Sequence, residues 1–298
     1  MTIYFLGILT LILPIALILW LSLSPVNTRL DLLLRSFFVG CTVFIFYKIG
    51  LWSLTSFYLR YFLLVIFLIS FTYLLYKNLN SSSVHKTLIR PVNYLLFPLS
   101  ITSFILSIFV SMGTTYNNAT STELAFPFSQ GNYLILQGGS NFTTNPFHYQ
   151  ATSASFALDI IKLNRFGNRA SHFYPRQLNQ YNIFNEKILS PCSGTVIEAV
   201  DNQIDNKPKR VNTRHPAGNH LILLCNNVKV FLAHLKQNSI RVTPGTHVST
   251  GQVLASAGNS GFTDEPHLHI QANQLDNTPV VILFNNRSYS INDLYTAM

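Results

Sequence analysis

The sequence predicts an N-terminal bundle of four transmembrane helices followed by a mainly β domain. Of its 298 residues, 48% are apolar and only 10% are charged, whereas soluble domains usually carry about 25% charged residues. The charges are also uneven, because residues 1–113 contain a single acid, Asp31, and the other ten acids follow. After residue 130, short runs rich in β-branched side chains replace the long apolar stretches. We therefore predict a transmembrane region at 1–113, a linker at 114–130 and a β domain at 131–298.

Four stretches with few or no charges predict the membrane spans. A helix of about 20 apolar residues crosses the roughly 30 Å hydrocarbon core. The first stretch lacks the basic start of a cleaved signal peptide, so we expect it to be retained. The two tryptophans, Trp20 and Trp52, lie near span ends, where an interfacial aromatic belt is expected. The predicted spans are residues 2–24, 36–55, 57–76 and 91–112.

Positive charge in the loops predicts the orientation. Lys and Arg near span ends are retained on the cytoplasmic side, and Lys77, Lys86 and Arg90 lie in one loop without an acid. This loop is expected inside, which places the C-terminal domain outside; Arg60 alone opposes the assignment. We expect an integral protein of the cytoplasmic (inner) membrane with an extracytoplasmic, periplasmic domain. The spans are expected to be a lipid-embedded anchor, with a sensor or transporter role as the alternative.

The β domain is predicted from eight short strands separated by Gly, Pro, Asn and Asp, a pattern typical of an antiparallel sandwich or barrel. Two long polar loops, 164–185 and 201–218, interrupt it, and such loops often border a functional groove. Cys192 and Cys225 lie next to strands and form either a disulfide or two buried thiols. The predicted strands are 133–137, 156–162, 194–200, 219–224, 228–234, 252–255, 268–272 and 280–284.

Histidine is the strongest chemical signal of the β half, which contains eight of the nine histidines. His267 and His269 stand two apart on a predicted strand, so both side chains would face the same site. Such a pair alone is better explained by two polar side chains on a sheet surface. Nucleic acid is not expected as a partner, because the Lys and Arg residues are scattered apart from a small cluster at 207–214, despite the net charge of +9.

The order of several motifs resembles the lysostaphin-like zinc metalloendopeptidases, which cut peptidoglycan cross-links. The segment FALDI at 156–160 resembles the strand with the ligand aspartate, and FLAHL at 231–235 resembles the catalytic strand. PHLH at 266–269 resembles the last motif of the family. Between them lie SPCSGTV at 190–196, GNHLIL at 218–223, GQVL at 251–254 and GNSG at 258–261. The resemblance covers about 156–271, so the predicted spans lie outside it.

This resemblance implies a β fold of the lysostaphin-like type and a zinc site. It makes Asp159 and His269 zinc ligands and places His234 and His267 beside the metal-bound water, with their roles as base or stabiliser left open. Zinc with three protein ligands lowers the pKa of a bound water towards about 7 and polarises the scissile carbonyl. Asn219 and His220 are the candidates for contacts with substrate, although Asn219 could as easily cap a turn and a histidine such as His220 is more often a sheet-surface residue.

One position departs from the family. Its usual first ligand is a histidine four residues before the aspartate, and here that position is Ser155, whose hydroxyl is a poor zinc ligand. His148 is expected to replace it, as in a variant subgroup, with His172 in reserve. We therefore expect a membrane-anchored zinc metalloendopeptidase acting on peptidoglycan peptides. The alternative is a catalytically inactive peptidase-like domain that binds the cell wall or activates another wall hydrolase.

Overall fold

The computed structural model describes residues 2–26, 28–79, 91–117 and 119–298. The chain forms two compact units, Met1–Ser111 and Met112–Met298, which are described one after the other. Most of the loop that predicts the orientation, including Lys86 and Arg90, lies outside the described residues.

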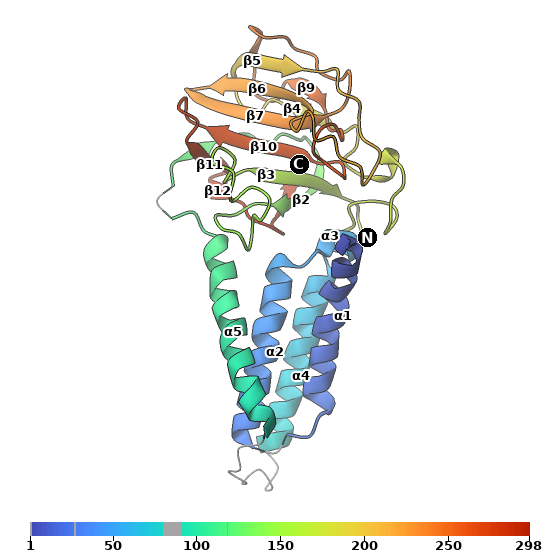
Figure 1. Ribbon diagram of the computed structural model, residues 1–298, viewed down its shortest axis with the longest axis vertical. Helices are drawn as coiled ribbons and strands as arrows, with labels where there is room; N and C mark the ends of the chain where they lie inside the picture. Colours follow the sequence, from blue (N-terminus) through green and yellow to red (C-terminus); the bar gives the residue numbers. More distant parts are fainter. Residues whose placement is uncertain (1, 27, 80–90, 118) are drawn as a thin grey trace. The chain divides into compact units, whose positions relative to one another are not determined.

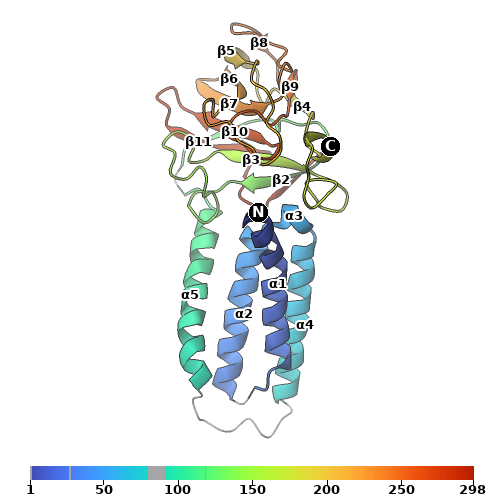
Figure 2. The ribbon, with the colours of Figure 1, turned by 45° about the vertical axis from the view of Figure 1, so that its right-hand side comes forward.

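Four helices of the first unit are long and apolar enough to cross a membrane, as the sequence predicts. Figure 2 shows α1, α2 and α4 side by side. Helix α5 contacts α2 through the Ser100 hydroxyl, which donates to the Leu34 carbonyl at 3.2 Å. The helices are α1 (Thr2–Leu23), α2 (Arg29–Ile49), the short α3 (Trp52–Thr55), α4 (Leu59–Leu79) and α5 (Pro91–Gly113).

The second span begins and ends earlier than the predicted 36–55. Helix α2 begins at Arg29 because the Thr28 side chain caps it, accepting a hydrogen bond from the Asp31 N–H at 3.0 Å. The Asp31 charge is compensated one turn later by Arg35, at 2.6 Å. Trp52 is fully buried within the unit, and its Nε1 donates to the Phe46 carbonyl in the last turn of α2. Its expected place at the membrane interface stays a prediction.

The second unit is built on an eleven-stranded sheet, in which eight strands follow the order β13-β2-β3-β10-β7-β6-β5-β8 and β1, β11 and β12 join off this path. Figure 1 shows the part of this order from β2 to β5. Neighbouring strands are antiparallel except for β1, which pairs in parallel with β11. A separate two-stranded sheet consists of β4 and β9. The strands are β1 (Ser121–Glu123), β2 (Gly131–Gln137), β3 (Leu158–Leu163), β4 (Lys187–Leu189), β5 (Gly194–Val200), β6 (Asn219–Cys225), β7 (Val228–Leu235), β8 (His247–Val248), β9 (Val253–Ser256), β10 (Leu268–Asn273), β11 (Pro279–Phe284), β12 (Arg287–Ser288) and β13 (Leu294–Ala297).

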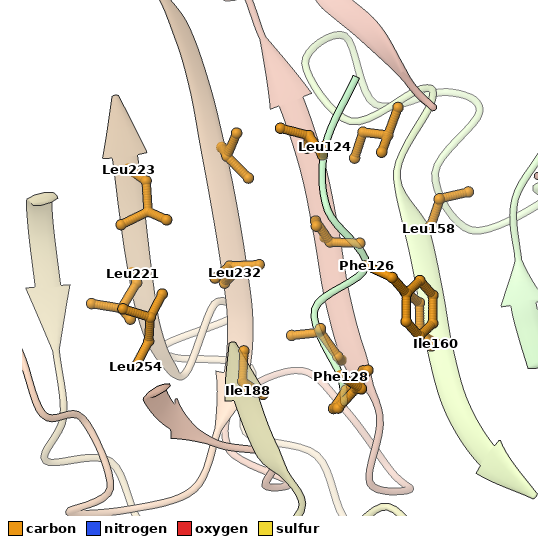
Figure 3. Close-up of a cluster of buried hydrophobic side chains, with 14 of the residues drawn as sticks. Leu124, Phe126, Phe128, Leu158, Ile160, Ile188, Leu221, Leu223, Leu232 and Leu254 are labelled. Atoms are coloured by element: carbon orange, nitrogen blue, oxygen red, sulfur yellow. The ribbon is translucent and has the colours of Figure 1, made fainter. Parts of the chain in front are cut away.

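The core lies between the large sheet and the small one. Figure 3 shows Leu221 and Leu232 of the large sheet together with Ile188 and Leu254 of the small sheet, all of them fully buried. All eight predicted strands are confirmed. The strands that the sequence pattern did not indicate, namely β1, β4, β8, β12 and β13, have two to four residues each, which is too short for a visible alternation.

The stretch expected as a linker at 114–130 contributes to the β unit. Its strand β1 pairs with β11, and Leu124, Phe126 and Phe128 are buried in the core (Figure 3). These three side chains stand at every second position and so face the same side. They bury apolar surface against the core, which the Thr, Asn and Ser residues before them cannot do. Cys192 and Cys225 form a disulfide that ties the start of β5 to the end of β6, which decides between the two alternatives left open by the sequence.

Candidate metal centre

The sheet brings two candidate ligands face to face. Strands β3 and β10 are antiparallel neighbours, and their register pairs Asp159 directly with His269. Both residues are buried, at 6% and 8% exposure, and the His269 Nδ1 atom lies 3.1 Å from Asp159 Oδ1. His267 immediately precedes β10, and its Nε2 lies 3.6 Å from the same carboxylate oxygen. The His-x-His pair therefore faces Asp159 with both of its rings.

A bulge turns His234 towards this group. The pairing of β6 with β7 shifts between Asn219 and Leu221, and His234 has a left-handed backbone with φ of 62°, which is uncommon for a residue other than glycine. Leu232 and Leu235, three residues apart, therefore both face the core. The His234 ring instead lies 4.8 Å from the His267 ring, centre to centre.

His148 reaches the site from a loop rather than from a strand. Its Nε2 lies 3.6 Å from Asp159 Oδ2, and its ring centre is 4.9 Å from that of His269. His172, the reserve candidate, is exposed and pairs through Nδ1 with the neighbouring Ser171 hydroxyl. The ligand atoms of His148, Asp159 and His269 all lie within 4.8 Å of one another, so these residues form a candidate metal site.

His269 Nε2 carries the proton of the neutral ring, so Nδ1, the nitrogen that faces Asp159, has none. Gln271 donates through Nε2 to the Ser153 carbonyl and to Asn273 Oδ1, so its Oε1 is an acceptor and His269 Nε2–H is the donor at 3.0 Å. The Nδ1 lone pair then faces the Asp159 carboxylate. Two acceptors at 3.1 Å repel each other unless a proton or a cation lies between them.

The charges of the site keep Asp159 ionised. Burial alone would raise the pKa of the carboxyl, but His148, His267 and His269 outweigh it and lower that pKa well below its usual range. Burial lowers the pKa of His148. For His269 burial acts in the same direction, but the hydrogen bond and charge of Asp159 prevail and raise its pKa. One anionic oxygen ligand and two imidazoles are a donor set that suits zinc.

His234 and His267 expose the same nitrogen to the site. His234 Nδ1 lies 2.8 Å from the Ser260 carbonyl and His267 Nδ1 lies 2.9 Å from the Glu265 carbonyl. A carbonyl only accepts, so Nδ1 carries the proton and Nε2 has the lone pair in each neutral ring. Burial, followed by the neighbouring His267 and His269, lowers the pKa of His234 well below its usual value, which favours the neutral ring.

Asn219 and His220 are both engaged within the domain. The fully buried Asn219 side chain donates to the Gln203 and Leu235 carbonyls and accepts from the Gln203 N–H. It thereby joins the loop at 201–218 to β7. His220 contacts the Gly218 carbonyl and the Glu198 carboxylate through its two ring nitrogens. The contacts with substrate expected for these two residues stay a prediction.

Three residues outside the predicted site support its histidines. Asn145 contacts His148, and Gln271 contacts His269. The sequence could have indicated Gln271, because it stands two positions after His269 on the same strand and so faces the same side of the sheet. Arg169 is the third. Its guanidinium makes two hydrogen bonds with the Glu265 carboxylate, and the backbone carbonyl of Glu265 accepts from His267 Nδ1.

Comparison with known proteins identifies the β unit. Residues 181–281 match the model of peptidase family M23, a range that contains His234, His267 and His269 but neither His148 nor Asp159. The β unit is therefore an M23 peptidase domain that follows four long apolar helices, and the resemblance to lysostaphin-like peptidases is confirmed at this level. The variant subgroup inferred from Ser155 stays a prediction. No curated protein matches the chain significantly.

The solved structures to which the chain is similar are distant. A zinc-containing peptidase from Vibrio cholerae is 22% identical over 55% of this chain, with a TM-score of 0.33. The catalytic domain of lysostaphin from Staphylococcus simulans is 18% identical over 53% of this chain and 82% of its own length, with a TM-score of 0.27. The present chain covers 39% of the length of the Vibrio protein.

Proposed function

We propose that this chain is a membrane-anchored zinc metalloendopeptidase that hydrolyses peptide bonds of peptidoglycan outside the cytoplasm. The convergence of His148, Asp159 and His269 within 4.8 Å, beside two more imidazoles, carries the proposal. The M23 match supports a peptide substrate. The resemblance to lysostaphin-like enzymes supports the cell wall as its source.

The residues of the site divide between metal and proton transfer. His148, Asp159 and His269 would hold a zinc ion, which when bound supplies a water of lowered pKa and polarises the scissile carbonyl. His234 and His267 each present an Nε2 lone pair, because backbone carbonyls occupy their Nδ1–H groups. One ring accepts the proton of the attacking water, and a protonated ring delivers a proton to the leaving amine.

Two independent features support a location of the β domain outside the cytoplasm. The positive charge between the third and fourth predicted spans favours the cytoplasmic side for that loop. The Cys192–Cys225 disulfide is a feature that persists outside the reducing cytosol.

A Ser249→Cys variant tests directly on which side of the membrane the β domain lies, since this residue is exposed. We expect it to react with a membrane-impermeant maleimide in cells with an intact cytoplasmic membrane, and protection of the thiol until lysis would contradict the assignment.

The catalytic proposal is tested with the full chain in detergent micelles. We expect about one zinc per chain and cleavage of cross-linked wall peptides, with the new amine and carboxyl ends identified by mass spectrometry. Cleavage should stop with a chelator and return with zinc. A chain that binds no metal in excess zinc would overturn the proposal. A chain that binds zinc and wall peptide but leaves every bond intact would instead be an inactive wall-binding module.

A further inference from the structure

The candidate ligand His148 depends on one buried side chain for its position. Asp159 and His269 lie on hydrogen-bonded strands, whereas His148 lies on a loop between β2 and β3. Three residues earlier, Asn145 is fully buried. Its Oδ1 lies 2.9 Å from His148 Nδ1, and its backbone carbonyl accepts the N–H groups of His148 and Tyr149 at 3.2 and 2.9 Å.

The amide of Asn145 also closes the loop. Its Nδ2 lies within hydrogen-bonding distance of three carbonyls. The Gly139 carbonyl (3.4 Å) is at the start of the loop, and the Ser155 (3.1 Å) and Ala157 (3.2 Å) carbonyls are at its end. Ala157 directly precedes β3, so the same amide fixes the loop to the strand of Asp159. Since all three partners are acceptors, Nδ2 must face them and Oδ1 must face His148.

This orientation determines which His148 nitrogen is available. An amide oxygen only accepts, so His148 Nδ1 carries the proton and the neutral ring has its lone pair on Nε2. Nε2 is the atom that faces Asp159, 3.6 Å from Oδ2. Without the amide, the ring would be free to rotate or to adopt the other tautomer, in which Nε2 is not a metal ligand.

We propose that Asn145 is the positioning residue of the metal centre. It sets the place and the tautomer of His148. A histidine on this loop can therefore serve as the ligand in place of a side chain at position 155. The inference rests on the proposed function in requiring that His148, Asp159 and His269 bind zinc. It concerns metal affinity and not only turnover.

The first test measures zinc affinity of the full chain by competition with a chromogenic chelator. Partners that orient a metal ligand typically contribute 10–100-fold to affinity, so Asn145→Ala should bind zinc about 10–100-fold more weakly. Asn182→Ala is the control. Its amide likewise closes a loop, by donating to the Asn168 carbonyl at 2.8 Å. Among the described residues, the Asn182 side chain bonds to backbone carbonyls and to no candidate ligand, so the zinc affinity of this variant should equal that of the wild type.

A double-mutant cycle separates positioning from general support of the fold. If Asn145 acts through His148, Asn145→Ala should have no further effect on zinc affinity once His148→Ala is present. If Asn145 only stabilises the domain, the two losses of affinity should multiply. That result would overturn the proposal.

A second measurement does not depend on any variant. In the zinc-loaded wild-type chain, ¹⁵N–¹H correlation spectra of the histidine rings should show His148 protonated at Nδ1, and a proton at Nε2 would overturn the proposal even if Asn145→Ala failed to fold. Failure of the proposed function and failure of the role of Asn145 give different results. A wild-type chain without zinc contradicts the proposed function, whereas a wild-type chain with zinc and an equally tight Asn145→Ala variant contradicts this inference alone.

Discussion

His269 Nδ1 lies 3.1 Å from Asp159 Oδ1, although 110 positions separate the two residues in the chain. They meet because β3 and β10 are neighbours in the sheet and these residues are opposite each other in the register. The carboxylate therefore contacts His269 directly and has His148 and His267 within 3.6 Å. It is the group on which the other members of the site converge.

Asp159→Asn should abolish tight zinc binding while keeping the fold, because the amide has nearly the same shape but no charge. We expect affinity to fall by more than about 100-fold, beyond the effect typical of residues that only orient a ligand. Equilibrium dialysis measures this. Asp276→Asn is the matched control, since that carboxylate is exposed and accepts hydrogen bonds from Thr278 in a turn. Equal zinc affinity of the wild type and Asp159→Asn would exclude this carboxylate as a ligand.

His234→Ala and His267→Ala should each lower the rate of peptide cleavage with little loss of zinc, because neither belongs to the ligand group. General acid–base groups typically contribute about 10²–10⁴-fold to rate, and kcat should fall by this factor. His247→Ala is the control, since His247 is exposed and begins β8. A cleavage rate that survives both substitutions would assign proton transfer to other groups.

Arg169→Ala should strongly destabilise the β domain. The guanidinium is 4% exposed and bound to Glu265 at 2.6 and 2.8 Å, and removing one partner of a buried pair costs about 3–5 kcal/mol. Pulse proteolysis in increasing urea measures the free energy of unfolding. The exposed pair of Arg287 and Asp293, at 3.3 Å with the arginine 59% exposed, provides the contrast. Arg287→Ala should cost at most about 1 kcal/mol, and equal losses for both variants would refute the prediction.

The Cys192–Cys225 disulfide should stabilise the β domain against unfolding. It joins residues 33 positions apart, and removing a native disulfide typically costs about 2–5 kcal/mol. The double variant Cys192→Ala with Cys225→Ala should lose this amount in the same urea experiment and should no longer respond to a reductant. Cys41→Ala, which removes the free thiol of α2, should leave the response to reductant intact. A wild-type domain indifferent to reduction would contradict the prediction.

The four long helices and eight of the strands were predictable from the sequence, because each depends on a local pattern. A run of about 20 apolar residues identifies a span by itself, and alternation identifies a strand such as β6, where Leu221, Leu223 and Cys225 face the core in turn. The start of α2 at Arg29 could not be predicted from the apolar pattern, since it depends on the cap by Thr28. The contact of Trp52 with α2 could not be predicted either, since it is a hydrogen bond to a residue six positions earlier. Two-residue strands such as β8 have no period at all.

The sequence by itself determined which residue types were available to the site: a carboxylate on one strand and a His-x-His pair at the start of another. Tertiary structure alone decided that Asp159 pairs with His269, that a bulge with φ of 62° turns His234 to their side, and that His148 rather than His172 joins them. The physical reason is that side-chain periodicity operates over a few residues, whereas register, bulges and loop closure depend on hydrogen bonds between segments far apart in the chain. One such bond, from Asn145 to Ala157, fixes the loop of His148 to the strand of Asp159.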